Sequence, residues 1–144
     1  MQIDKINPTA FQAKFIHTDD LKNVVEYAVK HNKFDKLNEA RKNIDKAYLQ
    51  HRIRFELSQY PDGRPYVIFT RYAPKKNAKI IRTEEDYIKS EPLIYECSKE
   101  MNPLKYGLLK LIKLGNNAPY NRMYEKVVIR GESLSTKYKR NFNT

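Results

Sequence analysis

Residues 49–73 read LQHRIRFELSQYPDGRPYVIFTRYA, and this stretch decides the fold because it carries the clearest β-strand pattern in the chain. At its centre, Tyr60-Pro61-Asp62-Gly63 supplies the residues that a type I turn prefers, with the glycine able to adopt the left-handed conformation that follows. Such a turn joins two antiparallel strands. The sequence therefore predicts a β-hairpin that turns at Asp62-Gly63.

The turn also determines how the two strands pair. It places Leu57 opposite Val67 and Phe55 opposite Phe69, which gives one face of the hairpin an apolar surface suited to a core. Because side chains alternate along a strand, the other face receives a set that is rich in arginine and tyrosine. That set comprises Arg52, Arg54, Glu56, Ser58, Tyr66, Ile68, Thr70 and Tyr72.

Helix patterns precede the hairpin. Thr18 is a suitable N-cap for a helix over residues 21–29, whose apolar side chains recur at the spacing of one helical face. Asn32 is the expected cap of a second helix over residues 34–48, which is less apolar. Looser alternation over residues 10–16 predicts a short strand before both helices.

The segments after the hairpin predict one further strand and several helices. The strand is expected at residues 78–82, and a capping box at Thr83 predicts a short helix directly after it. Another helix is expected to begin at Ser90, with Leu93, Ile94, Cys97 and Met101 on its apolar side. Two more are expected, one over residues 102–114 that stops at Gly115, and one that begins at Pro119.

Together these patterns predict an α+β fold, with a small antiparallel sheet built on the central hairpin at about 49–73 and flanked by several amphipathic helices. Residues 1–130 are expected to form a single globular domain, since that length can bury a core without disulfides or metals. Residues 131–144 are polar and basic, and we expect them to form a flexible tail.

Positive charge is concentrated in two blocks of the chain. The formal net charge is +11, and residues 46–82 carry nine Lys and Arg against two acidic residues, a net +7. Residues 102–144 also carry nine against two, another net +7, whereas residues 83–101 are net acidic. A field of this sign attracts anions, and nucleic acid is the commonest large anion in a cell.

No pattern of catalytic or metal-binding residues accompanies the charge. The three histidines and Cys97 show no zinc-type spacing, and Cys97 lies on an apolar stripe where a buried, inert thiol is expected. Pro61-Asp62 resembles the start of a two-carboxylate nuclease motif, but no Glu-x-Lys or Asp-x-Lys follows it. Acidic residues 84–86 and Glu91 are better explained as first-turn complements of helix dipoles. We therefore expect a protein that is not an enzyme and uses no cofactor or metal.

The leading hypothesis is an accessory protein that binds nucleic acid or a nucleoprotein. Arginine pairs with phosphates and tyrosine offers a stacking surface for unpaired bases, so the Arg/Tyr face of the hairpin would make the main contact. The basic C-terminal segment would add contacts to phosphates. The alternative is that helices cover both faces of the hairpin, which would make Tyr66 and Tyr72 core or edge residues. The candidate binding residues are Arg52, Arg54, Tyr66, Tyr72, Lys75, Lys76, Lys105, Lys113, Lys137, Lys139 and Arg140.

Two other functions fit the same residues. The basic surface could dock on an acidic or nucleic-acid-binding groove of a partner enzyme, as an inhibitor or regulator of phage or mobile-element type does, because tyrosine and arginine are frequent interface anchors. A pocket lined by Arg and Tyr could instead hold a small phosphorylated ligand. The chain has no apolar run long enough to span a membrane and no secretory signal, and its single cysteine suits a reducing compartment, so we expect a cytoplasmic location.

Overall fold

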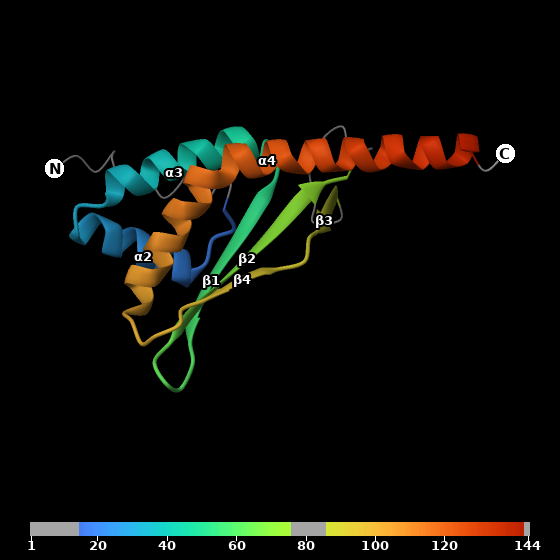
Figure 1. The fold of residues 1–144 in the computed structure, drawn as a ribbon. Coiled ribbons are helices and arrows are strands. Elements are labelled where there is room, and N and C mark those ends of the chain that lie inside the picture. Colours follow the sequence, from blue (N-terminus) through green and yellow to red (C-terminus); the bar gives the residue numbers. More distant parts are fainter. Residues whose placement is uncertain (1–14, 76–85, 143–144) are drawn as a thin grey trace.

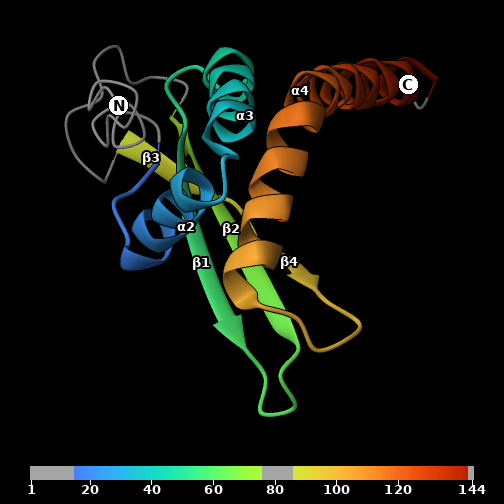
Figure 2. The same ribbon diagram turned by 90° about the vertical axis from the view of Figure 1, so that its left-hand side faces the viewer.

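The structure is a computed structural model that describes residues 15–75 and 86–142, with the side chains of the last helix described as far as Val127. Within those residues the chain is α+β, with three helices and an antiparallel sheet of four strands. The helices gather on one face of the sheet (Figures 1 and 2). In chain order the elements are α2 (Asp19–Lys30), α3 (Phe34–Ala47), β1 (Arg52–Gln59), β2 (Pro65–Pro74), β3 (Tyr87–Lys89), β4 (Leu93–Glu96) and α4 (Pro103–Phe142).

The hairpin β1–β2 forms in the predicted register. Phe55 pairs with Phe69 and Leu57 with Val67, and these side chains face the helices. At the turn, Gly63 adopts φ of 90°, and its N–H donates to the carbonyl three residues earlier at 2.9 Å. This is the geometry of a type I turn followed by a left-handed glycine. The predicted turn and pairing are confirmed.

The hairpin is central in only one of its strands. β2 is the internal strand, with β1 along one side and both β3 and β4 along the other. β4 pairs with residues 66–69 of β2, and β3 pairs with residues 72–74. β1 is therefore an edge strand, and such an edge needs partners for its free backbone groups.

Residues 15–20 provide those partners along β1. The Ile16 N–H donates to a β1 carbonyl at 2.8 Å, the Thr18 hydroxyl donates to another at 3.1 Å, and the Asp20 carboxylate accepts from a β1 N–H at 3.0 Å. The Thr18 oxygen also accepts from the Leu21 N–H at 3.2 Å, which is the predicted N-cap of α2. Thr18 thus caps the N-terminus of α2 and also donates a hydrogen bond to a backbone carbonyl of the edge strand β1.

The core lies between the sheet and the helices, where α4 approaches β1 closely. A Cβ placed on Gly107 of α4 would lie 3.1 to 3.2 Å from side-chain atoms of Val24, Phe55 and Leu57. This glycine has no turn role and serves to bring helix and sheet together. The largest side chains that are fully buried in this core are Phe15, Phe55, Leu37, Ile44, Leu111, Val24 and Val67.

The two helices predicted on either side of residues 115–119 are one helix. α4 passes through Gly115 and Pro119 without interruption, so the predicted stop and restart are wrong. Pro119 lacks the N–H of a regular turn, which favours a bend, and α4 changes direction along its length (Figures 1 and 2). The backbone of residues 131–142 is helical, and the division of the chain into a domain and a tail stays a prediction.

The helix predicted from Ser90 is also wrong, because Leu93–Glu96 form strand β4. Ile94 lies opposite Ile68 of β2, and the Cys97 N–H donates to the Pro65 carbonyl at 2.9 Å. The short apolar pattern of Leu93, Ile94, Cys97 and Met101 is compatible with a strand as well as with a helix. This segment forms a strand because it pairs with the free edge of β2.

Three other local expectations are corrected or fall outside the described residues. Tyr87–Lys89 form β3 in place of the helix expected after Thr83. Asn32 is not a helix cap: it adopts φ of 56°, and Lys33 occupies the N-cap position of α3 without a side-chain hydrogen bond. Residues 10–14 and the strand predicted at 78–82 lie outside the described residues, although Phe15 forms a single parallel bridge with Ile53.

Candidate nucleic-acid interface

A row of side chains crosses three strands on the face of the sheet opposite the helices. Arg52 of β1 pairs with Tyr72 of β2, and Tyr72 pairs with Lys89 of β3. Adjacent strands lie about 4.8 Å apart, so the backbones of Arg52 and Lys89 are separated by about 10 Å. The sheet therefore holds a tyrosine between two cations.

A groove of about 360 Å³ runs along this row. Arg54 enters it because it lies two positions after Arg52 on β1, and Tyr87 enters it because it lies two positions before Lys89 on β3. Three cations and two aromatic rings thus converge on one depression. Its lining consists of Ile16, Arg52, Arg54, Tyr72, Tyr87 and Lys89, which we call the Arg/Tyr groove.

The charges of the groove are only partly balanced. Arg54 Nε lies 3.6 Å from the Glu56 carboxylate, and both side chains are about half exposed, so this pair is weak. Within residues 15–75 and 86–127, no ion pair engages Arg52 or Lys89. Among the described side chains, cations therefore outnumber carboxylates at the groove, as an anionic ligand would require.

Tyr66 lies at the other end of the same face. It is six residues from Tyr72 along β2, a separation of about 20 Å. The centre of its ring lies 4.6 Å from the centre of the Tyr60 ring. The Tyr60 hydroxyl donates a hydrogen bond to the Glu96 carboxylate at 2.8 Å. That hydrogen bond raises the pKa of Tyr60. Since Glu96 is also the strand partner of Tyr66, this end of the sheet carries a carboxylate and is a poor site for phosphate.

Among the described side chains, none of the remaining predicted binding residues lines the groove. Lys75 follows β2 directly and is exposed, and Lys76 lies outside the described residues. Lys105 and Lys113 are exposed on α4, which packs on the opposite face of the sheet. Lys137, Lys139 and Arg140 belong to the last turns of the α4 backbone, beyond the described side chains.

Sequence reasoning missed Tyr87 and Lys89. The alternation Tyr87-Ile88-Lys89 could have indicated a strand with an aromatic and a basic side chain on one face. A helix is expected from the sequence at this position, so the alternation is not interpreted as a strand. The pairing of β3 with β2 is a long-range contact that no local pattern reveals.

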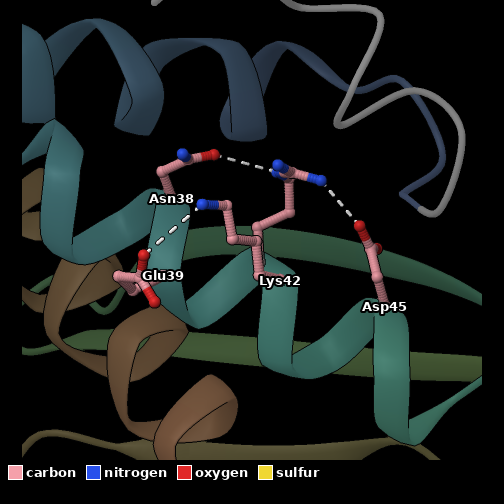
Figure 3. A network of polar contacts seen from close by, with 5 residues as sticks. Asn38, Glu39, Lys42 and Asp45 are labelled. Carbon is pink, nitrogen blue, oxygen red and sulfur yellow. Dashed lines mark hydrogen bonds and ion pairs between the residues drawn. The ribbon is translucent and has the colours of Figure 1, made fainter.

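Two of the cations on α3 are paired with acids of the same helix. Arg41 donates to Asn38 at 3.1 Å and pairs with Asp45 at 2.6 Å, while Lys42 lies 3.5 Å from Glu39 (Figure 3). These contacts pair two of the four cations of α3 with acids of the same helix. With four cations and three acids, α3 has a surplus of one positive charge, whereas three cations line the Arg/Tyr groove.

A second unusual surface lies on the outer half of α4, beyond Pro119. Tyr120, Met123, Tyr124 and Val127 recur at the spacing of one helical face, and each is 58 to 65% exposed. Exposed apolar side chains in a continuous stripe are typical of interaction surfaces. We call these four residues the α4 stripe.

The described residues add no sign of metal chemistry or membrane insertion. No three His, Cys, Asp or Glu side chains among them lie close enough to hold a metal ion, and Cys97 is buried. No helix in the described part of the chain is long and apolar enough to cross a membrane. Comparison with protein-family models, curated proteins and solved structures finds no match to this chain. We therefore infer function from the arrangement of side chains.

Proposed function

We propose that this protein binds single-stranded nucleic acid, without catalysing a reaction, through the Arg/Tyr groove. The observation that carries the proposal is the row Arg52–Tyr72–Lys89 across three strands, joined in one groove by Arg54 and Tyr87. A basic groove with aromatic rings is the usual arrangement for binding single strands, since cations hold the phosphates and rings stack on the bases.

The size and charge of the groove set the expected binding mode. Three cations can contact about three phosphates, which predicts that log K falls with log salt at a slope of about −2 for a single strand. Two rings can stack on one or two bases, at about 1–3 kcal/mol each. The protein is therefore expected to bind a short stretch of strand with little sequence preference.

The test is fluorescence anisotropy with labelled 15-mers of deoxythymidine and uridine, measured over a range of salt concentrations. Replacing Arg52→Gln and Arg54→Gln together should flatten the slope by about 1.4, because two cations are removed from the groove. The matched control removes two cations from the opposite side of the sheet, with Lys105→Gln and Lys113→Gln. That control should keep the slope of the parent.

Three outcomes would overturn the proposal. One is affinity that does not respond to salt, and another is equal weakening in the groove variant and the α4 control. The third is a mononucleotide that competes as well as the 15-mer, which would instead indicate a pocket for a small phosphorylated ligand.

The α4 stripe favours a second candidate function, docking on a protein partner. Tyr120, Met123 and Tyr124 offer large exposed side chains of the kind that anchor interfaces. In that case Tyr120→Ser with Met123→Ser would abolish capture of a partner from nuclease-treated host extract, whereas the groove variant would retain it. Loss of capture in the groove variant alone would argue against this second function.

A further inference from the structure

A cavity of about 330 Å³ lies between β2, β4 and the outer half of α4, on the helix side of the sheet. Ile53, Phe69 and Leu114 give it apolar walls, and the rings of Tyr95 and Tyr124 also line it. Its volume is at the lower end of the range for small-molecule sites, about 300–1,000 Å³. Rings and aliphatic walls of this kind suit a small flat molecule.

The charges at this cavity are already matched to one another. Arg71 Nη1 donates to both oxygens of Glu125 at 2.8 and 3.0 Å, and Arg122 donates to the same carboxylate at 3.1 Å. The Arg71 guanidinium also lies over the Tyr48 ring, 4.9 Å from its centre. Glu91, a second carboxylate, lines the cavity. An anionic ligand would approach two carboxylates and a cation would approach Arg71, so an uncharged ligand fits best.

The cavity still offers hydrogen bonds that nothing in the described residues uses. The Asn121 side chain can both donate and accept at this cavity, and the Glu91 carboxylate can accept. Arg71 Nε also has no hydrogen-bond partner among the described residues, but it has almost no accessible surface and is not a contact for a ligand. A molecule with donors and acceptors along one flat edge would meet Asn121 and Glu91.

We infer that this cavity binds an uncharged, planar heteroaromatic molecule of nucleobase size. The flat ring lies against the tyrosine rings that line the cavity, and a ring acceptor takes an N–H of the Asn121 amide. The site is separate from the Arg/Tyr groove, because Arg71 and Tyr72 are adjacent on β2 and so point to opposite faces of the sheet. The inference therefore does not depend on the proposed function.

The test titrates adenosine, guanosine, cytidine and uridine, each at millimolar concentration, into the full chain labelled with ¹⁵N. At least one nucleoside should bind and shift the Asn121 side-chain amide resonances. Indole has a ring N–H but no ring acceptor. It should bind about two- to tenfold more weakly than that nucleoside, which is the loss expected for one hydrogen bond.

Two variants and two controls separate this site from others. Asn121→Ala and Glu91→Ala should each weaken nucleoside binding about two- to tenfold, because each removes one hydrogen-bonding side chain from the cavity. Asn116→Ala, at an exposed position of α4 outside the cavity, and Tyr72→Ala in the groove should leave the affinity unchanged. The inference is overturned if no nucleoside binds, if indole binds equally well, if both cavity variants match the parent, or if Tyr72→Ala alone abolishes binding.

Discussion

Gly115 of α4 lies directly against Ala40 of α3, so closely that a Cβ on the glycine would overlap the Cα and Cβ of the alanine. Ala40 is fully buried, and its side chain is the smallest that a helix former offers. The two helices therefore cross with their backbones in contact. A glycine in the interior of a helix is unfavourable by itself, and this crossing explains why one is present.

Gly115→Ala should destabilise the protein by about 1–3 kcal/mol, because overlap with the α3 backbone cannot be relieved by a side-chain rotation. The gain in helix propensity, about 1 kcal/mol, acts in the opposite direction and reduces the loss. Urea unfolding measures the difference. The neighbouring exposed position provides the control, since Asn116→Ala gains propensity without an overlap and should be neutral or stabilising. A stabilised Gly115→Ala variant would contradict the crossing.

Phe55→Ala should lower the free energy of unfolding by about 3–5 kcal/mol, because the ring is fully buried against Phe69 and α4. Arg54→Ala, one residue earlier and on the exposed face, should change it by less than about 0.5 kcal/mol. Thermal or urea unfolding of both variants tests the strand register. Equal losses at the two positions would show that the register is wrong.

Local sequence was sufficient where two signals coincided at one place. The cap at Thr18 and the apolar stripe after it define α2, and the turn at Asp62-Gly63 agrees with the alternation on both sides of it. A different start for α2 or a different register for the hairpin would leave apolar side chains in water or backbone groups unpaired. Those predictions are confirmed for that reason.

Local sequence failed where a distant contact decides the structure. A glycine after an apolar stripe can end a helix or permit a close crossing, and only the position of Ala40 distinguishes the two for Gly115. Leu93–Glu96 become a strand because β2 has a free edge at that point. The same limit applies to the candidate site: Arg52, Arg54 and Tyr72 follow from the hairpin register, whereas Tyr87 and Lys89 depend on pairing with β3.

Tyr72→Ala should weaken the binding of a labelled single strand by about 1–3 kcal/mol, since the ring is expected to stack on a base in the groove. Tyr66→Ala should have little effect, because its ring lies beside Tyr60 and near Glu96 at the far end of the sheet. Anisotropy gives the affinities, and melting temperatures show whether both variants remain folded. Equal affinities for the parent and Tyr72→Ala would exclude stacking on this residue.

Glu125 should contribute stability that depends on pH. Burial of its carboxyl acts to raise the pKa, but the hydrogen bonds and charges of Arg71 and Arg122 outweigh it, so the pKa lies below the ordinary value of 4.5. Since the folded pKa is the lower one, this stability is present above pH 4.5 and is lost as the pH falls through the folded pKa.

Glu125→Gln should therefore flatten the loss of unfolding free energy that the parent shows as the pH falls below 4.5. Denaturant unfolding at several pH values measures this slope in the parent and the variant. Glu39→Gln, which removes an exposed carboxylate from a weak pair with Lys42, should keep the slope of the parent. Parallel curves for the parent and Glu125→Gln would contradict the inferred role of the Arg71–Glu125 pair.

The length of α4 beyond Pro119 has a mechanical consequence. A helix rises about 1.5 Å per residue, so the backbone from Pro119 to Phe142 extends about 35 Å, and the crossing at Gly115 fixes the part that precedes it. The direction of the outer half of α4 is therefore set by the backbone near Pro119. A change in direction of about ten degrees at that point would move the Phe142 end through about 6 Å. Whatever contacts the last turns of α4 is thus positioned by the geometry of a few residues near its middle.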